Sequence, residues 1–586
     1  MHSTPPVSTI PMASPNYSFK DIAQVSLNFA RNDLAEDKVV RNIPGFFDKY
    51  FSTQLWTTSV QKILKQQEIA QCLSRFDVQV LKNSQKGALQ EWILDLQALT
   101  RGMTRLDLFH QPGADLDKTS QFHLCYRKRS KNGSGEHIEV FGEYHPSSDE
   151  EATPDNYESL LPFFSRVQQV FAQQPTRRFL HAFMISGSML ELWVVDRSGA
   201  FSSGILSLEE APDLLGRVLT TYAIMDDTDL GLNSFLLYDA VLECGPRVMF
   251  DSLSSFYLRP IPIAVSDYIV GPGTTCYAAS RSRDEEPYFV VKFSWRKSKE
   301  YIELDILERM LERNVQGTIR VVNVHDNLAN LTDLHKGLQL PGAFQDSIQS
   351  CIVITPLGTQ LQEFVSTSEL LDVLADTVDA LRSLYIDGGI LHRDLAIKNI
   401  VIASSPDKGR NRGVLIDLDS AQNVLGAPPT DGFKGSDGFV AIEVLLGGLH
   451  TYHTDLESLF YVFLWLVIGN EREYPHPNII LFNLSESSPL RKWVSKDFHA
   501  VAQAKIADMS LEGFQTILQE FSTNFLQLRG LAEELHSLIF RPSKNGAVIL
   551  VAGISQTAAE RLYRDMSAAL RRQSFVERRG ERSFLS

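Results

Sequence analysis

The sequence predicts an α+β fold in which a β-rich part is followed by a mainly helical part, with a further α/β region at the N-terminus. Strand-like segments rich in apolar and β-branched residues occur at 179–195 and again at 262–294. From residue 366 to about 570, apolar residues recur mainly at helical spacing. The loop with most of the candidate chemistry, residues 390–400, lies near the junction of these two parts.

Length and composition limit the classes of protein that fit. A chain of 586 residues exceeds one hydrophobic core, so we expect roughly two to four domains. Its net charge of −15 disfavours general nucleic-acid binding. The five cysteines show no zinc spacing, and the longest apolar run, Leu459 to Ile468, is too short to cross a bilayer. We expect an intracellular protein of the cytoplasm or nucleus, with neither nucleic acid nor membrane as partner.

The elements of the N-terminal region are expected in a mixed order. Helical spacing appears at 89–99, and a hairpin is predicted from Phe122 to Tyr144 with Asn132-Gly133 as its turn. A second hairpin at 179–195 turns at Ser186-Gly187-Ser188, and residues 208–240 are predicted to be largely helical.

The second half begins with the β-rich block at 262–294, and an amphipathic helix is predicted at 299–313. Ser366 and Glu369 form a capping box ahead of a helix that Gly388-Gly389 closes. Helices are expected to continue to about 570.

The loop Ile390 to Ile400 contains His392-Arg393-Asp394 and, five residues after the Asp, Asn399. This spacing is the geometry that holds a substrate hydroxyl and a magnesium ion beside the end of a nucleoside triphosphate. It is therefore the leading candidate for a site of chemistry.

Upstream of this loop, Gly271 and Gly273 lie between two strand-like segments, where glycines let backbone amides approach phosphate oxygens. A plain hairpin turn is the alternative. Lys292 ends an apolar strand, and a Lys in that position needs a partner or an anion. Glu303, on the following helix, is the preferred partner, with Glu300 and Glu308 as rivals and a solvated helix charge as the alternative.

Downstream, Asp417 ends a short apolar strand, which suits a magnesium ligand, although such an Asp is also a common turn residue. Glu443 follows a Gly- and Ser-rich segment in Ala441-Ile442-Glu443. Asp455 stands at the start of an apolar run to Ile468 that we expect to be a buried helix, where it can cap the helix and anchor the catalytic loop.

Together these segments resemble the eukaryotic protein kinase fold, and in particular the fungal-type protein kinase family. The phrases that carry the resemblance span roughly 180–570 and include 192–203, 390–400, 415–419, 438–443 and 455–461. The resemblance implies a bilobal fold with a β-rich N-lobe and a helical C-lobe, ATP and Mg²⁺ as cofactors, and transfer of the γ-phosphate of ATP to Ser/Thr hydroxyls of protein substrates.

The resemblance also implies roles for single residues. Asp394 would be the catalytic base and Lys398 would neutralise the transferring phosphoryl group. Magnesium would be held by Asn399 and Asp417, and the phosphates by Lys292, paired with Glu303, under Gly271 and Gly273. The adenine would meet the hinge at 352–357, which includes Ile354, Pro356 and Leu357. Structural support would come from His392, Arg393, Glu443 and Asp455.

The predicted organisation combines these readings, and the N-terminal region is also a candidate for binding a further protein. It comprises a disordered Ser/Pro-rich tail at 1–18, an α/β region at 19–250 whose hairpin at 179–203 associates with the N-lobe, an N-lobe and hinge at 251–362, a C-lobe at 363–570, and a basic disordered tail at 571–586.

The sequence departs from the usual kinase pattern at three places. Cys276 replaces the third glycine of the phosphate loop, Asp417-Leu418-Asp419 replaces Asp-Phe-Gly, and Ala396 stands where Ser/Thr kinases usually carry a Lys. Two alternatives to a protein kinase therefore stay open: a pseudokinase that acts as an interaction scaffold, and a small-molecule kinase on the same fold.

Overall fold

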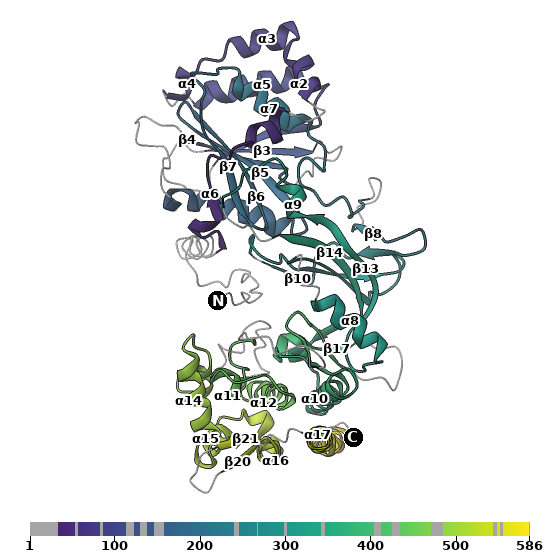
Figure 1. Cartoon of the computed structure of the whole chain (residues 1–586). Helices are drawn as coiled ribbons and strands as arrows, with labels where there is room; N and C mark the ends of the chain where they lie inside the picture. The colour runs from purple at the N-terminus through teal and green to yellow at the C-terminus, as the bar shows by residue number, and fades with distance from the viewer. Residues whose placement is uncertain are drawn as a thin grey trace.

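The fold is α+β, as predicted, and its three parts follow one another along the chain (Figure 1). We call residues 33–238 the N-terminal domain, residues 245–355 the β-lobe and residues 358–584 the helical lobe. The computed structural model describes residues 33–52, 57–82, 86–112, 122–128, 137–145, 157–238, 245–266, 268–297, 302–341, 346–403, 412–424, 434–469, 484–542, 548–550 and 555–584.

The N-terminal domain is built on a mixed sheet of seven strands. In spatial order they are β1 (Val39–Val40), β7 (Gly199–Ser207), β6 (Met189–Asp196), β5 (Phe179–Ser186), β4 (Val140–His145), β3 (Phe122–Lys128) and β2 (Leu106–Pro112). Neighbours are antiparallel except at β1 with β7 and at β4 with β5. The parallel pair β4 and β5 requires a crossover, which α6 (Tyr157–Gln173) provides.

Helices cover both faces of this sheet, because alternate strand residues are apolar on each side. Leu160, Phe164 and Phe171 of α6 pack with Trp193 of β6 on one face. The helices other than α6 are α2 (Thr57–Leu64), α3 (Gln67–Ser74), α4 (Gln79–Lys82), α5 (Lys86–Thr100) and α7 (Leu214–Ile224).

The β-lobe is a second sheet of seven strands with one longer helix. Along the chain its elements are β8 (Arg247–Met249), β9 (Ser255–Leu258), β10 (Ala264–Val265), β11 (Thr275–Ser280), β12 (Phe289–Lys297), α8 (Ile302–Glu312), β13 (Arg320–Asn330), α9 (Leu331–Leu334) and β14 (Ser347–Thr355). The path β13-β14-β12-β11-β9-β8 places β12 at the centre, with β10 paired to β11.

The helical lobe packs around α12, an 18-residue helix of which every residue is buried, as its apolar run predicts. The helices of the lobe are α10 (Thr367–Arg382), α11 (Ile442–Leu445), α12 (Tyr452–Gly469), α14 (Phe498–Asp508), α15 (Leu511–Gln519), α16 (Arg529–Ile539) and α17 (Gln556–Phe584). Its short strands are β15 (Gly358–Gln360), β16 (Ile390–Leu391), β17 (Ile400–Ala403), β18 (Gly413–Leu415), β19 (Gln422–Asn423), β20 (Phe540–Pro542) and β21 (Val548–Leu550). In the part of the chain that the structure describes, no helix combines the length and apolar character needed to span a membrane.

Most predicted elements are confirmed. Strands β3 and β4 pair as the first hairpin, and β5 and β6 as the second. The hydroxyl of Ser366 caps α10 by accepting the amide of Glu369 at 3.1 Å. The turn Asn132-Gly133 and the tail at 1–18 lie outside the described residues.

One prediction about the N-terminal region needs correction. Residues 208–240 are not largely helical, because α7 ends at Ile224 and the chain continues in turns from Asp226 to Ser234. Aspartates there accept nearby amides, as Asp226 does from Thr228 at 2.8 Å, which favours turns over helix. The hairpin at 179–203 belongs to the sheet of the N-terminal domain, and its turn contacts the β-lobe as predicted, because the Gly271 amide donates to the Arg197 carbonyl at 3.0 Å.

The basic tail predicted to be disordered is helical, since α17 continues to Phe584. Buried residues recur along it at helical spacing: Ala559, Leu562, Tyr563, Met566, Ala569, Leu570 and Ser574. The arginines have partners on α10: Arg571 contacts Asp376 at 3.0 Å and Asp379 at 2.5 Å. The Arg-rich composition therefore reflects docking of α17 against an acidic face of α10, beside which it lies in Figure 1.

Replacing Ser574 tests this docking. Its side chain is buried, and its hydroxyl donates to Asp372 at 2.7 Å. We expect Ser574→Asp to bring two carboxylates together, to destabilise the docked helix by about 2 kcal/mol or more, and to lower the thermal unfolding midpoint. Ser574→Ala, the control, loses one hydrogen bond, worth about 1 kcal/mol. Limited proteolysis should cut α17 faster in the Asp variant only; equal cutting of both variants would contradict the docking.

Candidate active site

A β-hairpin places two predicted metal ligands at one end of the same pair of strands. Ile400 of β17 pairs with Leu415 of β18, and the Ile416 amide donates to the Asn399 carbonyl at 3.0 Å. Asn399 and Asp417 therefore flank the same end of the hairpin. Asp417 has a φ of 64°, in the left-handed region where a residue with a Cβ is strained.

The carboxylate of Asp394 is held by hydrogen bonds from both sides. The hydroxyl of Ser436 donates to Oδ1 at 2.7 Å, and Nδ2 of Asn399 lies 3.3 Å from Oδ2. The same Nδ2 donates to the Asp394 carbonyl at 2.8 Å. Nζ of Lys398 lies 4.0 Å from Oδ2. The predicted base and its predicted cationic neighbour are thus brought together.

Asp455 fixes the backbone of this loop, as predicted. Its two carboxylate oxygens accept the amides of His392 and Arg393, each at 2.9 Å. Burial raises the pKa of Asp455, while the His392 side chain and the two donated amides pull that pKa down. Asp455 lies inside the first turn of α12, so it acts as the anchor of the loop and not as the helix cap.

His392 links the loop to the hairpin. Its Nε2 lies 3.1 Å from the Ile416 carbonyl, and its Nδ1 lies 3.4 Å from the Asp394 amide. These partners fit a ring protonated on Nε2, which donates to the carbonyl while Nδ1 accepts. The loop and the strand that leads to Asp417 are therefore held in one register.

Lys292 on β12 reaches across to the helical lobe. Its Nζ donates to Oδ1 of Asp419 at 2.9 Å, so Lys292 pairs with the third residue of the Asp417-Leu418-Asp419 segment. The pKa of Asp417 is raised, first by burial and then by Asp419, whereas the Lys292 charge opposes the rise. The negative charge of Asp394 raises the pKa of Asp417 further, and the positive charge of Lys398 lowers it.

The donor set around Asp417 suits a hard divalent cation. Carboxylate and amide oxygens are the ligands that Mg²⁺ prefers. Because Nδ2 of Asn399 is used by Asp394, the amide oxygen of Asn399 is the atom suited to a cation. Burial and then the negative charge of Asp419 raise the pKa of Asp417, and a bound cation would counteract both.

The predicted phosphate loop lies between β10 and β11. Cys276 of β11 is directly opposite Lys292 of β12, so the loop ends next to the Lys. The Pro272 carbonyl accepts the Trp295 amide at 2.7 Å, and both Gly271 and Gly273 have positive φ. Glu303 lies on α8 as predicted, but its side chain is outside the described residues.

The predicted hinge follows β14. Ile354 forms the last pair between β14 and β12, opposite Val290. The Thr355–Pro356 peptide that follows is cis. The Leu357 amide donates to the Tyr288 carbonyl at 2.8 Å. This amide is therefore used within the protein, which distinguishes the segment from a hinge that offers that donor to an adenine.

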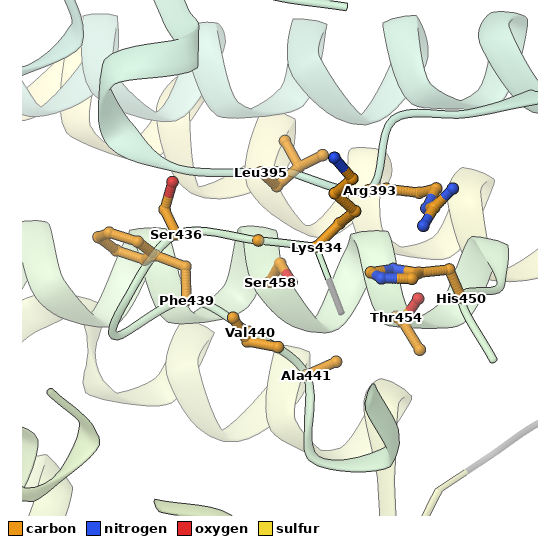
Figure 2. A pocket seen from close by; sticks show the side chains of 11 residues that line it. Arg393, Leu395, Lys434, Ser436, Phe439, Val440, Ala441, His450, Thr454 and Ser458 are labelled. Carbon is orange, nitrogen blue, oxygen red and sulfur yellow. The ribbon is translucent and has the colours of Figure 1, made fainter. Parts of the chain in front are cut away.

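A small pocket lies between Arg393 and Leu395 of the loop at 390–400 and the segment from Lys434 to Ala441 (Figure 2). Arg393, Lys434 and His450 gather at one end of it, and Phe439 lies at the other. Burial and the Arg393 charge lower the pKa of His450 to about 4, so this ring is neutral at physiological pH.

A buried charge pair supports the same segment from below. The Lys505 ammonium of α14 donates to the carbonyls of Gly438 and Val440 at 3.0 and 2.7 Å. It lies 3.9 Å from the centre of the Tyr461 ring. Glu457 of α12 accepts the Ile442 amide at 2.8 Å. Burial lowers the pKa of Lys505 and raises that of Glu457, and the opposite charge of each partner counteracts this shift.

Sequence reasoning missed four residues of this site. Glu457 had a usable signal, an acid inside an otherwise apolar helix. Ser436 stood in a Gly- and Ser-rich segment, and Asp419 was noted only as a departure from the kinase pattern. Lys505 had no local signal, because its partners lie more than sixty residues earlier in the chain. Glu443 lies half-buried on α11. The carboxylate that accepts the Ile442 amide belongs to Glu457 instead.

Comparison with known proteins gives matches to protein kinases. Serine/threonine-protein kinase/endoribonuclease ire-1 of Caenorhabditis elegans is 28% identical over 114 residues, which are 18% of this chain and 12% of that protein. Ribosomal protein S6 kinase alpha-4 of Homo sapiens is 30% identical over 118 residues, 18% of this chain and 14% of that protein. This chain thus matches a small part of each relative. The solved structure of vaccinia related kinase 3 aligns with 13% identity and a TM-score of 0.32, covering 56% of this chain and 91% of that one.

The family model described as fungal protein kinase matches residues 122–467, more than half of the chain. The match includes part of the N-terminal sheet, the whole β-lobe, the loop at 390–400 and α12 up to residue 467. The β-lobe and the helical lobe are thus the two lobes of a protein-kinase-like fold, and the chain belongs to the fungal protein kinase family.

Proposed function

We propose that this protein kinase transfers the γ-phosphate of ATP to Ser or Thr hydroxyls of protein substrates. The observation that carries the proposal is the contact between the two lobes beside Asp417. The Lys292 ammonium of the β-lobe donates to Asp419 at 2.9 Å, and Asn399, at the same end of the hairpin as Asp417, donates to the Asp394 carbonyl at 2.8 Å. Such a set positions a phosphoryl group between the two lobes.

Asp394 is proposed as the catalytic base. Ser436 and Asn399 fix its carboxylate, so an incoming hydroxyl meets an oriented acceptor. The contact with Ser436 supports an aliphatic hydroxyl as substrate, since a hydroxyl of this kind already lies 2.7 Å from Oδ1. Lys398 is exposed enough to move its ammonium toward a phosphoryl oxygen.

Asn399 and Asp417 are proposed to hold Mg²⁺, which when bound neutralises phosphate charge. Lys292 is proposed to bind the α- and β-phosphates together with the loop at Gly271 and Gly273. In the structure the Lys292 ammonium donates to Asp419 at 2.9 Å, and Glu303 is proposed as a further partner of the same ammonium. Ile354, Pro356 and Leu357 are proposed to line the adenine site through their side chains and carbonyls, because the Leu357 amide is already donated.

The two lobes are proposed to bind different reactants, as is usual for this fold. The β-lobe, with the hinge to residue 362, binds nucleotide. The helical lobe binds the protein substrate against the segment from Lys434 to Ala441. The first curated relative is named as a serine/threonine-protein kinase, which supports this class of acceptor.

Removing the carboxylate of Asp394 tests the proposal. We expect Asp394→Asn to lower phosphate transfer from Mg-ATP to a degenerate Ser/Thr peptide library by about 10²- to 10⁴-fold, the range for a general base. Asp284→Asn, on the exposed turn between β11 and β12, is the matched control and should transfer like wild type. Radiolabel incorporation measures both.

Other outcomes select the alternative functions. Wild type and Asp394→Asn that are equally inactive on every protein and peptide would make the chain a pseudokinase or scaffold. Transfer to small alcohols but never to protein would make it a small-molecule kinase, as the acidic Asp419 would suit.

Lys505 provides a second prediction, on substrate binding. Lys505→Met removes the donor to the Gly438 and Val440 carbonyls. We expect kcat/KM for peptide to fall about tenfold, which corresponds to the loss of about one charge-assisted hydrogen bond, while KM for ATP stays unchanged. Lys496→Met, on the exposed stretch before α14, is the control. A rise in KM for ATP as large as that for peptide would contradict the role in the substrate segment.

A further inference from the structure

The turn between β6 and β7 of the N-terminal domain reaches the phosphate loop of the β-lobe. Arg197 stands in this turn and is buried. Its Nη1 donates to the carbonyls of Tyr268 and Ile269 at 2.9 and 3.2 Å, and its Nη2 donates to the Pro175 carbonyl at 2.6 Å. One guanidinium thus ties the start of the phosphate loop to the N-terminal domain.

Both glycines of the loop contact the same arginine. The Gly271 amide donates to the Arg197 carbonyl at 3.0 Å. A Cβ on Gly273 would lie 2.6 Å from Cζ of Arg197, closer than atoms can pack. Gly273 also has a φ of +50°, so its missing side chain is required by both conformation and contact.

A second residue of the N-terminal domain holds the two amides ahead of Gly271. Asp33 is buried, and its carboxylate accepts the Ile269 amide at 2.6 Å and the Val270 amide at 2.9 Å. Gln168 of α6 donates to the same carboxylate at 3.3 Å. Three successive amides, from Ile269 to Gly271, therefore have their acceptors in the N-terminal domain.

The turn that carries Arg197 is itself rigid. Asp196 accepts the amide and the hydroxyl of Ser198 at 2.7 and 2.6 Å. Its other oxygen lies 2.6 Å from Nε2 of His335, which belongs to the segment between α9 and β14 of the β-lobe. The Arg197 side chain stacks on the Phe171 ring, with Cζ 5.0 Å from the ring centre. The β-lobe thus grips this turn at two places.

We propose that Arg197 and Asp33 are positioning residues through which the N-terminal domain sets the conformation of the phosphate loop. The proposal rests on the proposed function, since it assigns the loop to ATP. The N-terminal domain is then part of the nucleotide site and not only a surface for a partner. Holding the loop tip in place beside Lys292 reduces the ordering that binding would otherwise require.

Hydrogen–deuterium exchange tests whether Arg197 and Asp33 hold the phosphate loop, and it needs no catalysis. We expect Arg197→Ala and Asp33→Asn each to speed exchange of the amides at 268–273 by about tenfold, equivalent to about 1.4 kcal/mol of local opening. Arg75→Ala, on the exposed surface after α3, is the matched control and should leave this segment unchanged. Unchanged exchange in both test variants would overturn the proposal, whether or not the wild type transfers phosphate.

Steady-state kinetics tests the consequence for ATP. We expect Arg197→Ala to raise KM for ATP about tenfold with a smaller change in kcat for peptide, because a loosened loop weakens nucleotide binding. A merely structural role would lower the active fraction and so kcat, with KM unchanged. That result, or a lower KM for ATP, would overturn the proposal. Asp33→Asn keeps one side-chain acceptor and serves if Arg197→Ala does not fold.

A double-mutant cycle separates packing from phosphate binding at Gly273. We expect Gly273→Ala to lose less ATP affinity in the Arg197→Ala background than in wild type, because the clash with the guanidinium is gone. Additive effects would show that Gly273 and Arg197 act independently and would overturn the contact as the constraint on the loop. If the wild type transfers no phosphate but the variants show the exchange effect, the proposed function is wrong. The role of Arg197 and Asp33 in positioning the loop is then still supported.

Discussion

The rest of the active site depends on the buried carboxylate of Asp455. It accepts two successive amides of the catalytic loop from inside α12, a helix buried along its whole length. A carboxylate in such a place is costly unless its oxygens are satisfied, and the same bonds that satisfy it fix the loop. With His392 so placed, its ring reaches the Ile416 carbonyl, which sets the strand that leads to Asp417. The buried helix α12 therefore positions the loop and Asp417 through hydrogen bonds, and Asp455 cannot stay buried without the two that it accepts.

The same helix also supports the segment from Lys434 to Ala441. Glu457, two residues after Asp455, holds the Ile442 amide, and the Lys505 ammonium holds the carbonyls just before it. The catalytic loop and the segment from Lys434 to Ala441 thus share one rigid foundation. Ser436 joins them directly through its bond to Asp394. Because two buried carboxylates of one helix orient both parts, the protein itself determines the distance between Asp394 and the segment from Lys434 to Ala441.

How far the sequence could predict this structure depends on the range of the interaction. The loop from His392 to Asn399 and the hairpin to Asp417 are local, so spacing and strand pattern predict them, and the buried helix follows from its apolar run. The docking of α17 was missed because an Arg-rich segment lacks a visible partner until Asp376 and Asp379 are brought next to it by the fold. Lys505 and Arg197 were missed for the same reason, since their acceptors are backbone carbonyls that no residue type marks. Pairing of Lys292 with Asp419 depends on how the two lobes meet, which no local pattern contains.

The two glycines of the phosphate loop can be required for two different physical reasons. A Gly-x-Gly before a strand is expected where the backbone approaches phosphate, and the same glycines are needed where the backbone packs closely on a side chain. At Gly273 the second requirement can be measured in the structure, because a Cβ would collide with the Arg197 guanidinium whether or not a nucleotide is bound. At Gly271 the amide that such a motif offers to phosphate is already donated to the Arg197 carbonyl. The position of the third glycine in the usual pattern is taken here by Cys276, which lies in β11 opposite Lys292, where the backbone is regular strand and needs no glycine. Loss of that glycine is thus consistent with a loop whose shape is set by the N-terminal domain, and it is weak evidence that the kinase is inactive.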